Sequence, residues 1–294
     1  MEKIDYSYSI QELLSKVKQN KKYKTISDEI VLAEIKKYLK SNQIGENDKF
    51  SKNEEKQAIK EIRKRLHRLY SGYQTKKKNK REVYLEELKK VKNKRQLLEL
   101  TKKFLSIAIS TKERIDDYSL IYQKIFTITR KPKTITDLGA GLNALSFPLM
   151  DIEDLTYYSY DIDTEDMNFL NDYFEILKDE LKLRINGKAE ILDASNIDNI
   201  RKLKKSEIIF MFKLIDLIDS KSKKTRKISE DMIKEIFNLK KADFIVASFA
   251  KKTLSGKSMN IPIRRGFELM LERNNLNFFS FSTDSEIFYV IREK

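Results

Sequence analysis

The stretch that decides the fold is Thr134-Ile135-Thr136-Asp137-Leu138-Gly139-Ala140-Gly141. Its first five residues are β-prone and run directly into a glycine turn, as in a strand that enters a helix through a tight loop. Four more strands are expected at 155–160, 189–192, 208–212 and 244–249. Helical patterns separate them, around 142–150, 164–181, 195–205 and 229–240. Strands that alternate with helices predict a doubly wound α/β sheet of parallel strands.

The C-terminal end breaks this alternation. Phe278–Ser282 and Ile287–Ile291 are both β-prone, and only the four residues 283–286 separate them. A connection this short joins antiparallel neighbours, whereas parallel strands need a long crossover. We therefore expect an antiparallel hairpin that closes the sheet, an addition typical of methyltransferases rather than dehydrogenases.

The first hundred residues have helical periodicity instead. Apolar residues recur every three or four positions at 10–17, 30–39 and 58–70, and a further amphipathic helix is expected from Tyr84 to Leu105. Residues 1–100 hold 27 Lys and Arg against 15 Asp and Glu, whereas the remainder holds 33 against 30. A lysine-rich proteome would explain the total charge but explains this asymmetry less well. We expect a basic, helical, RNA-docking domain at 1–105 and an α/β domain at 106–294.

The composition excludes several kinds of site. Cysteine is absent and His67 is the single histidine, so neither a disulfide nor a thiolate or multi-histidine metal site can form. No apolar run is long enough to span a bilayer, and the N-terminus lacks the pattern of a signal peptide. The sequence therefore predicts a cytoplasmic protein with no membrane partner and no metal.

Acidic residues follow the strands at the edge where such sheets bind their ligands. Gly139 and Gly141 allow the backbone to approach a ligand, and Asp161 ends the second strand, where it could accept both ribose hydroxyls of an adenosyl group. Asp193 follows the third strand and is placed to meet an adenine amino group. Purely structural glycines and an NAD site are the alternatives, but the antiparallel tail disfavours a dehydrogenase.

Several short blocks run in order along nearly the whole chain. They are Lys21-Lys22-Tyr23, Arg65-Leu66-His67, ISTKER at 109–114, DLGAGLN at 137–143, FKL at 212–214, ASF at 247–249 and KTLSGK at 252–257. With these blocks the chain resembles the guanine-N7 methyltransferases of 16S rRNA, the aminoglycoside-resistance enzymes of the Rmt/Arm type. It departs from their usual pattern at Ala140, Ala144, Asp216, Ala250 and Ser255.

The resemblance implies a Rossmann-like class I methyltransferase sheet preceded by an all-helical extension that docks on the small ribosomal subunit. It implies S-adenosyl-L-methionine as the cofactor and a guanine of the decoding region as the target. Donor contacts are expected from Arg114, Asp137, Gly139, Gly141, Asp161, Asp193 and Phe212. Arg114 would clamp the methionine carboxylate of the donor, ideally with two parallel hydrogen bonds.

Two further groups of residues are expected to meet the substrate. Lys213 and Phe249 are candidates for positioning the target base. The RNA backbone would meet basic residues of both domains, namely Arg63, Arg65, Arg68, Lys76, Lys77, Lys78, Lys252, Lys257, Arg264 and Arg265. Each could instead be a solvated surface charge, but together they predict binding that weakens steeply with salt.

Transfer to guanine N7 fits these residues because N7 already carries an in-plane lone pair and needs no general base. Transfer to cytosine C5 would need a thiolate, which the chain lacks. The sequence predicts a monomeric rRNA methyltransferase that could confer aminoglycoside resistance. Two alternatives stay open: a catalytically silent RNA-binding or ribosome-assembly factor with the same fold, and a small-molecule methyltransferase with an incidental basic N-terminus.

Overall fold

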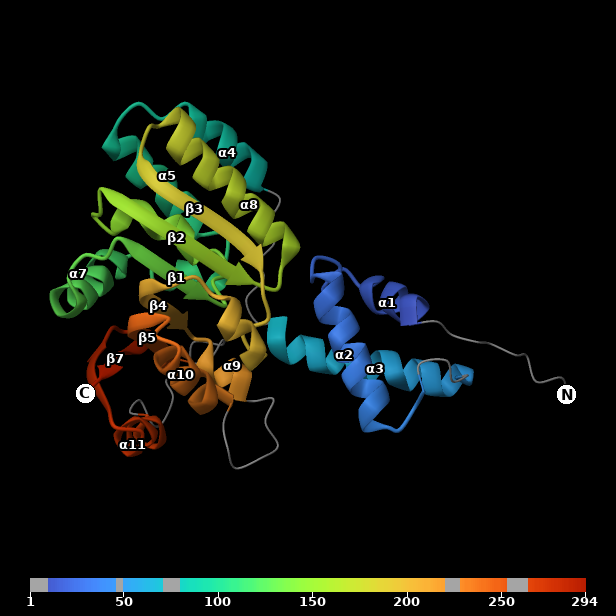
Figure 1. The fold of residues 1–294 in the computed structure, drawn as a ribbon. Helices are drawn as coiled ribbons and strands as arrows, with labels where there is room; N and C mark the ends of the chain where they lie inside the picture. Colours follow the sequence, from blue (N-terminus) through green and yellow to red (C-terminus); the bar gives the residue numbers. More distant parts are fainter. Residues whose placement is uncertain (1–9, 46–49, 71–79, 220–227, 253–263) are drawn as a thin grey trace, which may run out of the picture. The chain divides into compact units, whose positions relative to one another are not determined.

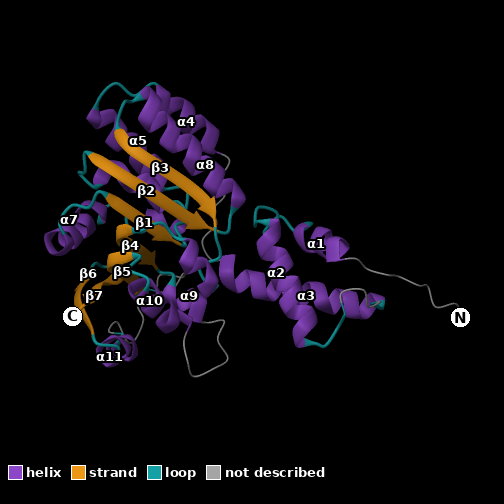
Figure 2. Ribbon diagram, viewed as in Figure 1, coloured by secondary structure: helices purple, strands orange, loops and turns teal. Residues whose placement is uncertain are grey.

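The computed structural model describes residues 10–45, 50–70, 80–219, 228–252 and 264–294, with the side chains of residues 68–70 left out. The chain divides into two compact units. The first comprises Met1–Gly72 together with Ile162–Thr164, and the second comprises Tyr73–Asp161 and Glu165–Lys294. Figure 1 colours both by sequence, and Figure 2 shows that the strands belong to the second unit.

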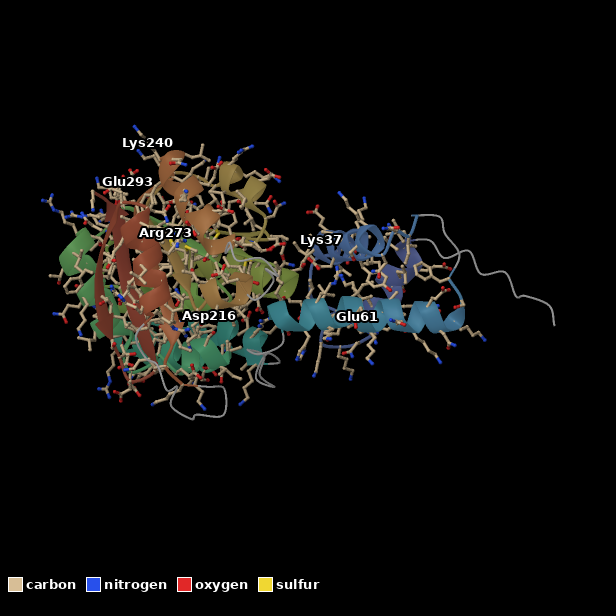
Figure 3. All side chains as sticks on the ribbon, turned by 90° about the horizontal axis from the view of Figure 1, so that it is seen from below. Lys37, Glu61, Asp216, Lys240, Arg273 and Glu293 are labelled. Carbon is tan, nitrogen blue, oxygen red and sulfur yellow. The ribbon has the colours of Figure 1, made fainter. Side chains whose placement is uncertain are left out.

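The first unit is built from the helices α1 (Ile10–Lys18), α2 (Asp28–Ser41) and α3 (Lys52–Tyr70). Their apolar faces pack together, which confirms the helical periodicity of the sequence. The buried residues include Leu13, Val17, Val31, Ile35, Ala58, Ile62 and Leu66. Charged side chains occupy the outer faces of the helices, as Figure 3 shows for Lys37 on α2 and Glu61 on α3.

The second unit contains a seven-stranded sheet in the described part of the chain, with the order β3-β2-β1-β4-β5-β7-β6. The strands are β1 (Thr134–Leu138), β2 (Asp154–Asp161), β3 (Arg184–Ile191), β4 (Ser206–Phe212), β5 (Ala242–Ala250), β6 (Leu276–Ser282) and β7 (Glu286–Glu293). The first five run parallel. The chain leaves β1 toward β2 and β3 and then crosses to β4, so the order reverses beside β1, where ligands of such sheets bind.

The expected antiparallel hairpin is confirmed. Strand β7 pairs antiparallel with β5, where Ile245 lies opposite Ile291, and β6 pairs antiparallel with β7 at the edge of the sheet. The two strands are slightly longer than the sequence pattern indicated. The sheet thus combines five parallel strands with an antiparallel pair, as the sequence predicted.

Helices cover the sheet or precede it. They are α4 (Arg81–Lys89), α5 (Lys94–Leu105), α6 (Ile109–Lys112), α7 (Tyr118–Thr129), α8 (Thr164–Glu175), α9 (Ile215–Asp219), α10 (Ile228–Asn238) and α11 (Arg265–Arg273). Shorter segments are the 3₁₀ helices η2 (Asn143–Leu149) and η4 (Ile197–Lys202) and the π-helical segment η3 (Ile176–Glu180). The single helix expected at 84–105 is two helices. Asn93 caps the second one by accepting a hydrogen bond of 3.0 Å from the amide of Gln96. The helix expected around 142–150 is the 3₁₀ segment η2, which contains Pro148.

The structure places the boundary between the units at residue 72 rather than at 105. Leu88 of α4 and Leu100 and Phe104 of α5 lie in one hydrophobic core with Ile135 of β1 and Tyr157 of β2. An amphipathic pattern shows that a helix buries one face, but it does not show which partner covers that face. Residues 73–105 therefore read as helical without revealing that they belong with the sheet.

Gly187 of β3 gives a test of this packing. An added Cβ would lie 2.1 Å from Cγ of Phe174, whose ring is buried. We expect Gly187→Ala to lower the free energy of unfolding by about 1–3 kcal/mol, because the ring must shift within a packed core. Gly266→Ala in α11 is the control, since its added Cβ meets no described atom within 4 Å. Equal denaturation midpoints for the two variants would contradict the packing described here.

Candidate active site

The turn after β1 has the backbone conformation that only glycine adopts readily. Gly139 and Gly141 have φ angles of 64° and 48°. An added Cβ at Gly139 would lie 2.6 Å from Cδ1 of Leu214, so this glycine is needed for close packing. At Gly141 an added Cβ would meet no described atom within 4 Å. A glycine that faces a ligand needs open space beside it, and Gly141 has this space.

Hydrogen bonds fasten this turn to the end of β2. The amide of Ala140 donates to the carbonyl of Tyr160 at 3.0 Å, and the amide of Gly141 donates to Oδ2 of Asp161 at 2.8 Å. The amide of Leu192 donates to the carbonyl of Asp161 at 2.9 Å. Asp161 therefore joins the ends of three adjacent strands, β1, β2 and β3.

Asp193 lies just beyond β3 and is partly exposed, like Asp161. Its Oδ1 accepts hydrogen bonds from the amide and the hydroxyl of Ser195, at 2.9 and 2.6 Å. These bonds orient the carboxylate. The sequence analysis did not select Ser195, although a serine two residues after an aspartate is a common local hydrogen-bonding pattern. Two accessible acids and an open glycine turn form a set of groups that suits an adenosyl ligand.

Asp137 has a different position from these two acids. Its carboxylate is buried, and Oδ2 accepts hydrogen bonds from Nδ2 of Asn143 at 2.9 Å and the hydroxyl of Tyr157 at 2.7 Å. Burial raises the pKa of Asp137 to about 6, although both hydrogen bonds and the charge of Arg114 oppose the shift. The structure thus places Asp137 in the support of the glycine turn, beneath its surface.

A buried ion cluster lies between α6, β4 and β7. Glu286 accepts hydrogen bonds from Nε of Arg114 at 2.6 Å and from Nη2 of Arg114 at 3.1 Å. It also accepts a hydrogen bond of 2.6 Å from the hydroxyl of Ser248, and Nζ of Lys213 lies 3.2 Å from its Oε1. Burial opposes ionisation of Glu286, but the charges of Arg114 and Lys213 outweigh it, so the pKa of Glu286 lies below its ordinary value. Lys213 pairs in addition with Glu113.

Glu286 was not among the predicted site residues, because in the sequence it stands at the end of the predicted hairpin turn. An acid directly before the apolar run Ile287–Ile291 is the signal that could have indicated it. The two-bond pairing expected between Arg114 and a donor carboxylate is made with Glu286 in the structure. The remaining guanidinium nitrogen, Nη1, lies 3.5 Å from Oδ1 of Asn143, close to the glycine turn.

The two candidate phenylalanines lie in the hydrophobic core. Phe212 stacks on Phe210 with ring centroids 4.7 Å apart, and the guanidinium of Arg114 lies 5.0 Å from its ring centre. Phe249 is 3% exposed and packs edge-to-face against Phe267 at 4.9 Å. The expectation that Phe249 stacks on a target base is therefore not supported, because its ring is already covered.

Several candidate RNA contacts already have protein partners. In the second unit, Arg264 donates to Asp216 at 2.9 Å and Arg265 pairs with Glu268 and Glu272, whereas Lys252 is exposed. In the first unit, Arg63 donates to the carbonyl of Lys16 at 2.6 Å, and Arg65 donates to the hydroxyl of Ser41 at 3.2 Å. Lys76, Lys77, Lys78 and Lys257, with the side chain of Arg68, lie outside the described residues.

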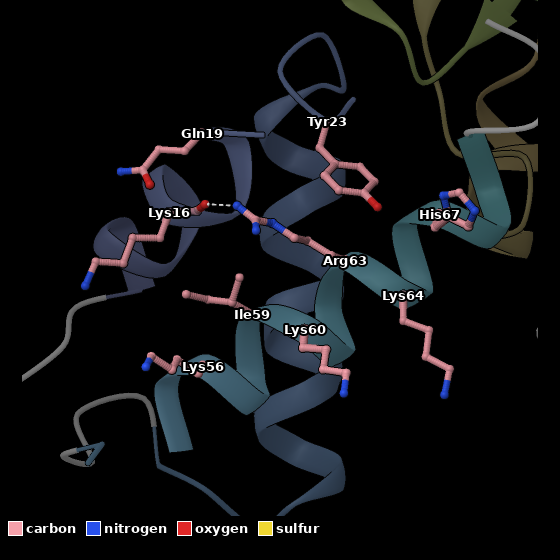
Figure 4. A pocket seen from close by; sticks show the side chains of 9 residues that line it. All are labelled: Lys16, Gln19, Tyr23, Lys56, Ile59, Lys60, Arg63, Lys64 and His67. Atoms are coloured by element: carbon pink, nitrogen blue, oxygen red, sulfur yellow. Dashed lines mark hydrogen bonds between the residues drawn. The ribbon is translucent and has the colours of Figure 1, made fainter. Parts of the chain in front are cut away.

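A basic groove lies within the first unit, between α1 and α3 (Figure 4). It has a volume of about 620 Å³, and none of the described residues that line it is acidic, although Lys16 at its edge pairs with Glu55 at 2.5 Å. The lining residues are Lys16, Gln19, Tyr23, Lys56, Ile59, Lys60, Arg63, Lys64 and His67. Apart from Arg63, none of them was among the expected RNA contacts.

Among the described residues, no group of three or more Asp, Glu or His side chains is arranged to hold a metal ion. Within the same ranges, every helix is too short or too polar to cross a membrane.

The buried Asp137 predicts a specific dependence of stability on pH. Its folded-state pKa of about 6 lies above the ordinary 3.8, so its contribution to stability is present below pH 4 and is lost as the pH rises through 6. Asp137→Asn has no charge to bury and can still accept both hydrogen bonds. We expect this variant to gain stability relative to the wild type between pH 4 and 6, by up to about 3 kcal/mol.

Denaturant unfolding at several pH values measures this difference. Asp151→Asn is the control, because Lys131 lowers the pKa of this exposed acid. It should be slightly less stable than the wild type above pH 4, a difference of opposite sign. A stability difference for Asp137→Asn that does not change between pH 4 and 7 would contradict the prediction.

The chain is similar to known proteins in sequence and in fold. A protein named 16S rRNA (guanine(1405)-N(7))-methyltransferase from Proteus mirabilis is 27% identical over 227 residues, which are 72% of this chain and 74% of that protein. One of the same name from Micromonospora rosea is 23% identical, over 64% of each chain. The solved structure of the 16S rRNA methyltransferase RmtF with S-adenosyl-L-homocysteine has a TM-score of 0.73 at 16% identity, covering 98% of this chain and 100% of that one. The 16S rRNA methylase RmtB has a TM-score of 0.68 at 18% identity, with the same coverage.

The likeness to the solved structures confirms the fold expected from the sequence. A family model described as ribosomal RNA methyltransferase (FmrO) matches residues 21–278, which is most of the chain. The glycine turn, Asp161 and Asp193 all lie within this match. The chain therefore belongs to the FmrO family of ribosomal RNA methyltransferases.

Proposed function

We propose that this chain is an S-adenosyl-L-methionine-dependent methyltransferase that modifies 16S rRNA at N7 of a guanine in the decoding region. One observation carries the proposal: the glycine turn is fastened to Asp161 at the switch point of a methyltransferase-type sheet, in a member of an rRNA methyltransferase family. The name of the Proteus mirabilis relative supports N7 of a 16S rRNA guanine as the acceptor. We infer that the enzyme acts as a monomer in the cytoplasm.

The donor would lie across the ends of β1, β2 and β3. Bound there, it supplies an electrophilic methyl group. Asp161 would accept hydrogen bonds from the ribose hydroxyls, Asp193 would meet the adenine, and Gly141 provides the space. Because Glu286 engages two nitrogens of Arg114, we propose that Arg114 offers a donor carboxylate only Nη1, in place of the two-bond clamp expected from the sequence.

The reaction needs little acid–base chemistry from the protein. The lone pair of guanine N7 attacks directly, so catalysis consists of positioning and electrostatics. Lys213 directly follows β4 and has a φ of 55°, which is unusual for a residue with a side chain. The amide of Lys213 donates to the carbonyl of Ser248 at 3.1 Å, which helps to hold this conformation. Backbone strain of this kind is concentrated at functional sites, and we propose that Lys213 borders the place of the target base.

The first unit would bind the RNA backbone through its basic groove. Lys56, Lys60 and Lys64 recur every four residues along α3, a rise of about 6 Å per step, so their charges form a row along one face of the helix. Arg63 serves a different purpose from the one expected, because it caps the last turn of α1 by donating to the carbonyls of Lys16 and Val17. We therefore assign the phosphate contacts of this groove mainly to the three lysines.

Methyl transfer can be measured directly. We expect the protein to transfer label from S-adenosyl-L-methionine to 16S rRNA, presented either in assembled small subunits or as naked RNA, and cleavage at N7-methylguanine to map one site in the decoding region. Asp161→Ala is the matched control, because it should lose donor binding and transfer together. Donor binding by the wild type without transfer to either RNA would contradict the proposal. Expression in a susceptible bacterium tests for aminoglycoside resistance.

The groove predicts the salt dependence of RNA binding. Replacing Lys56, Lys60 and Lys64 with glutamine should flatten the slope of log affinity against log salt by about 2–3, since each phosphate contact in a duplex contributes roughly 0.9. The control replaces Lys36, Lys37 and Lys40, which are exposed on α2 and do not line the groove. Filter binding to small subunits measures both slopes. Equal slopes for the two triple variants would remove the groove from the interface.

A further inference from the structure

The first unit contains three residues from far along the chain, Ile162–Thr164. They connect β2 to α8, and they directly follow Asp161. Within the first unit this segment pairs with Thr25–Ser27 as a short antiparallel bridge between Ile26 and Asp163. No sequence pattern indicates that these two segments, more than a hundred residues apart, lie side by side.

Three hydrogen bonds hold the pairing together. The amide of Ser27 donates to the carbonyl of Ile162 at 3.0 Å, and the amide of Thr164 donates to the carbonyl of Thr25 at 2.9 Å. The hydroxyl of Thr25 donates to Oδ2 of Asp163 at 2.9 Å. Ile26 and Asp163 are fully buried at the centre of the pairing, whereas Thr25, Ser27 and Ile162 are partly exposed. Burying a carboxylate is costly, and such a group is retained where hydrogen bonds hold it in place.

The residue before this segment is Asp161. It accepts hydrogen bonds from the amide of Gly141 in the glycine turn and from the amide of Leu192 after β3. Consecutive Cα atoms are 3.8 Å apart and each residue has only two soft dihedral angles. One residue, Ile162, therefore separates the anchored Asp161 from the buried Asp163. A shift of Asp163 cannot be absorbed along so short a connection without turning the backbone of Asp161.

We propose that Thr25 and Asp163 are positioning residues for the donor site: residues 25–27 hold the chain that follows Asp161 and so fix the direction of its carboxylate. The inference rests on the proposed function, in which Asp161 receives the donor ribose. Linkage is reciprocal, so a donor that orders Asp161 also stabilises the pairing of residues 25–27.

Thr25 is the better residue to change, because Asp163 directly precedes α8, where an acid also favours the start of a helix. Thr25→Val keeps the shape of the side chain and removes the hydroxyl. We expect calorimetry with S-adenosyl-L-methionine on the full chain to show affinity about three- to tenfold weaker than the wild type, the range that one lost hydrogen bond gives. Thr25→Ser restores the hydroxyl and should restore the affinity.

The variant Thr101→Val is the control that distinguishes a loss of donor-site positioning from a general loss of protein stability. Thr101 is 1% exposed, and its hydroxyl donates to the carbonyl of Leu97 at 2.8 Å within α5. This variant should lower the thermal midpoint without changing donor affinity. Donor affinity of Thr25→Val equal to that of Thr101→Val would overturn the inference and leave the proposed function intact. Failure of the wild type itself to bind the donor would instead count against the proposed function.

A second measurement needs no variant. Hydrogen exchange on the wild-type protein, with and without S-adenosyl-L-methionine, should show slower exchange on donor binding in peptides that cover residues 162–164 and also in those that cover residues 25–27. Protection confined to the glycine turn and residues 161–164, with residues 25–27 unchanged, would overturn the inference even if Thr25→Val did not fold.

Discussion

The hydrogen bond from the amide of Gly141 to Oδ2 of Asp161 is the contact on which the proposed donor site depends. It forms only because Gly139 and Gly141 adopt left-handed φ angles, which turn successive amides toward the end of β2. With the bond in place, one carboxylate is shared between the turn after β1 and the segment after β2. Asp137 supports the same turn from below through Asn143, so both faces of the loop are fixed before any ligand arrives.

The ion cluster around Glu286 organises the other half of the proposed site. The carboxylate of Glu286 contacts the guanidinium of Arg114, the ammonium of Lys213 and a hydroxyl. These three partners offset the cost of burying its charge only while all of them stay in place. The cluster therefore contributes geometry more than stability. It joins β7 of the antiparallel hairpin to β4 and α6, which gives the added hairpin a role in the site beyond closing the sheet.

The sequence predicted those features that depend on local pattern. The glycine turn, the acids at Asp161 and Asp193 and the C-terminal hairpin each follow from residue type and spacing within a few positions. Glu286 and Thr25 could not be predicted in this way, because their partners lie 172 and 138 residues away in the chain. The boundary expected at 105 was wrong for the same reason, since helical periodicity does not show which core a helix joins.

Three residues that were expected to contact the substrate contact the protein itself instead, and for one physical reason. Phe249, Arg63 and Arg264 were selected by residue type, as an aromatic or a basic side chain near a ligand-binding edge. In the folded chain Phe249 packs against Phe267, Arg63 caps α1 and Arg264 pairs with Asp216. A long side chain that satisfies the protein's own carbonyls or acids cannot bind a phosphate without breaking those bonds. The same argument applies within the groove: Lys16 pairs with Glu55 at 2.5 Å, which leaves Lys56, Lys60 and Lys64 as the groove lysines to which we assign the proposed phosphate contacts.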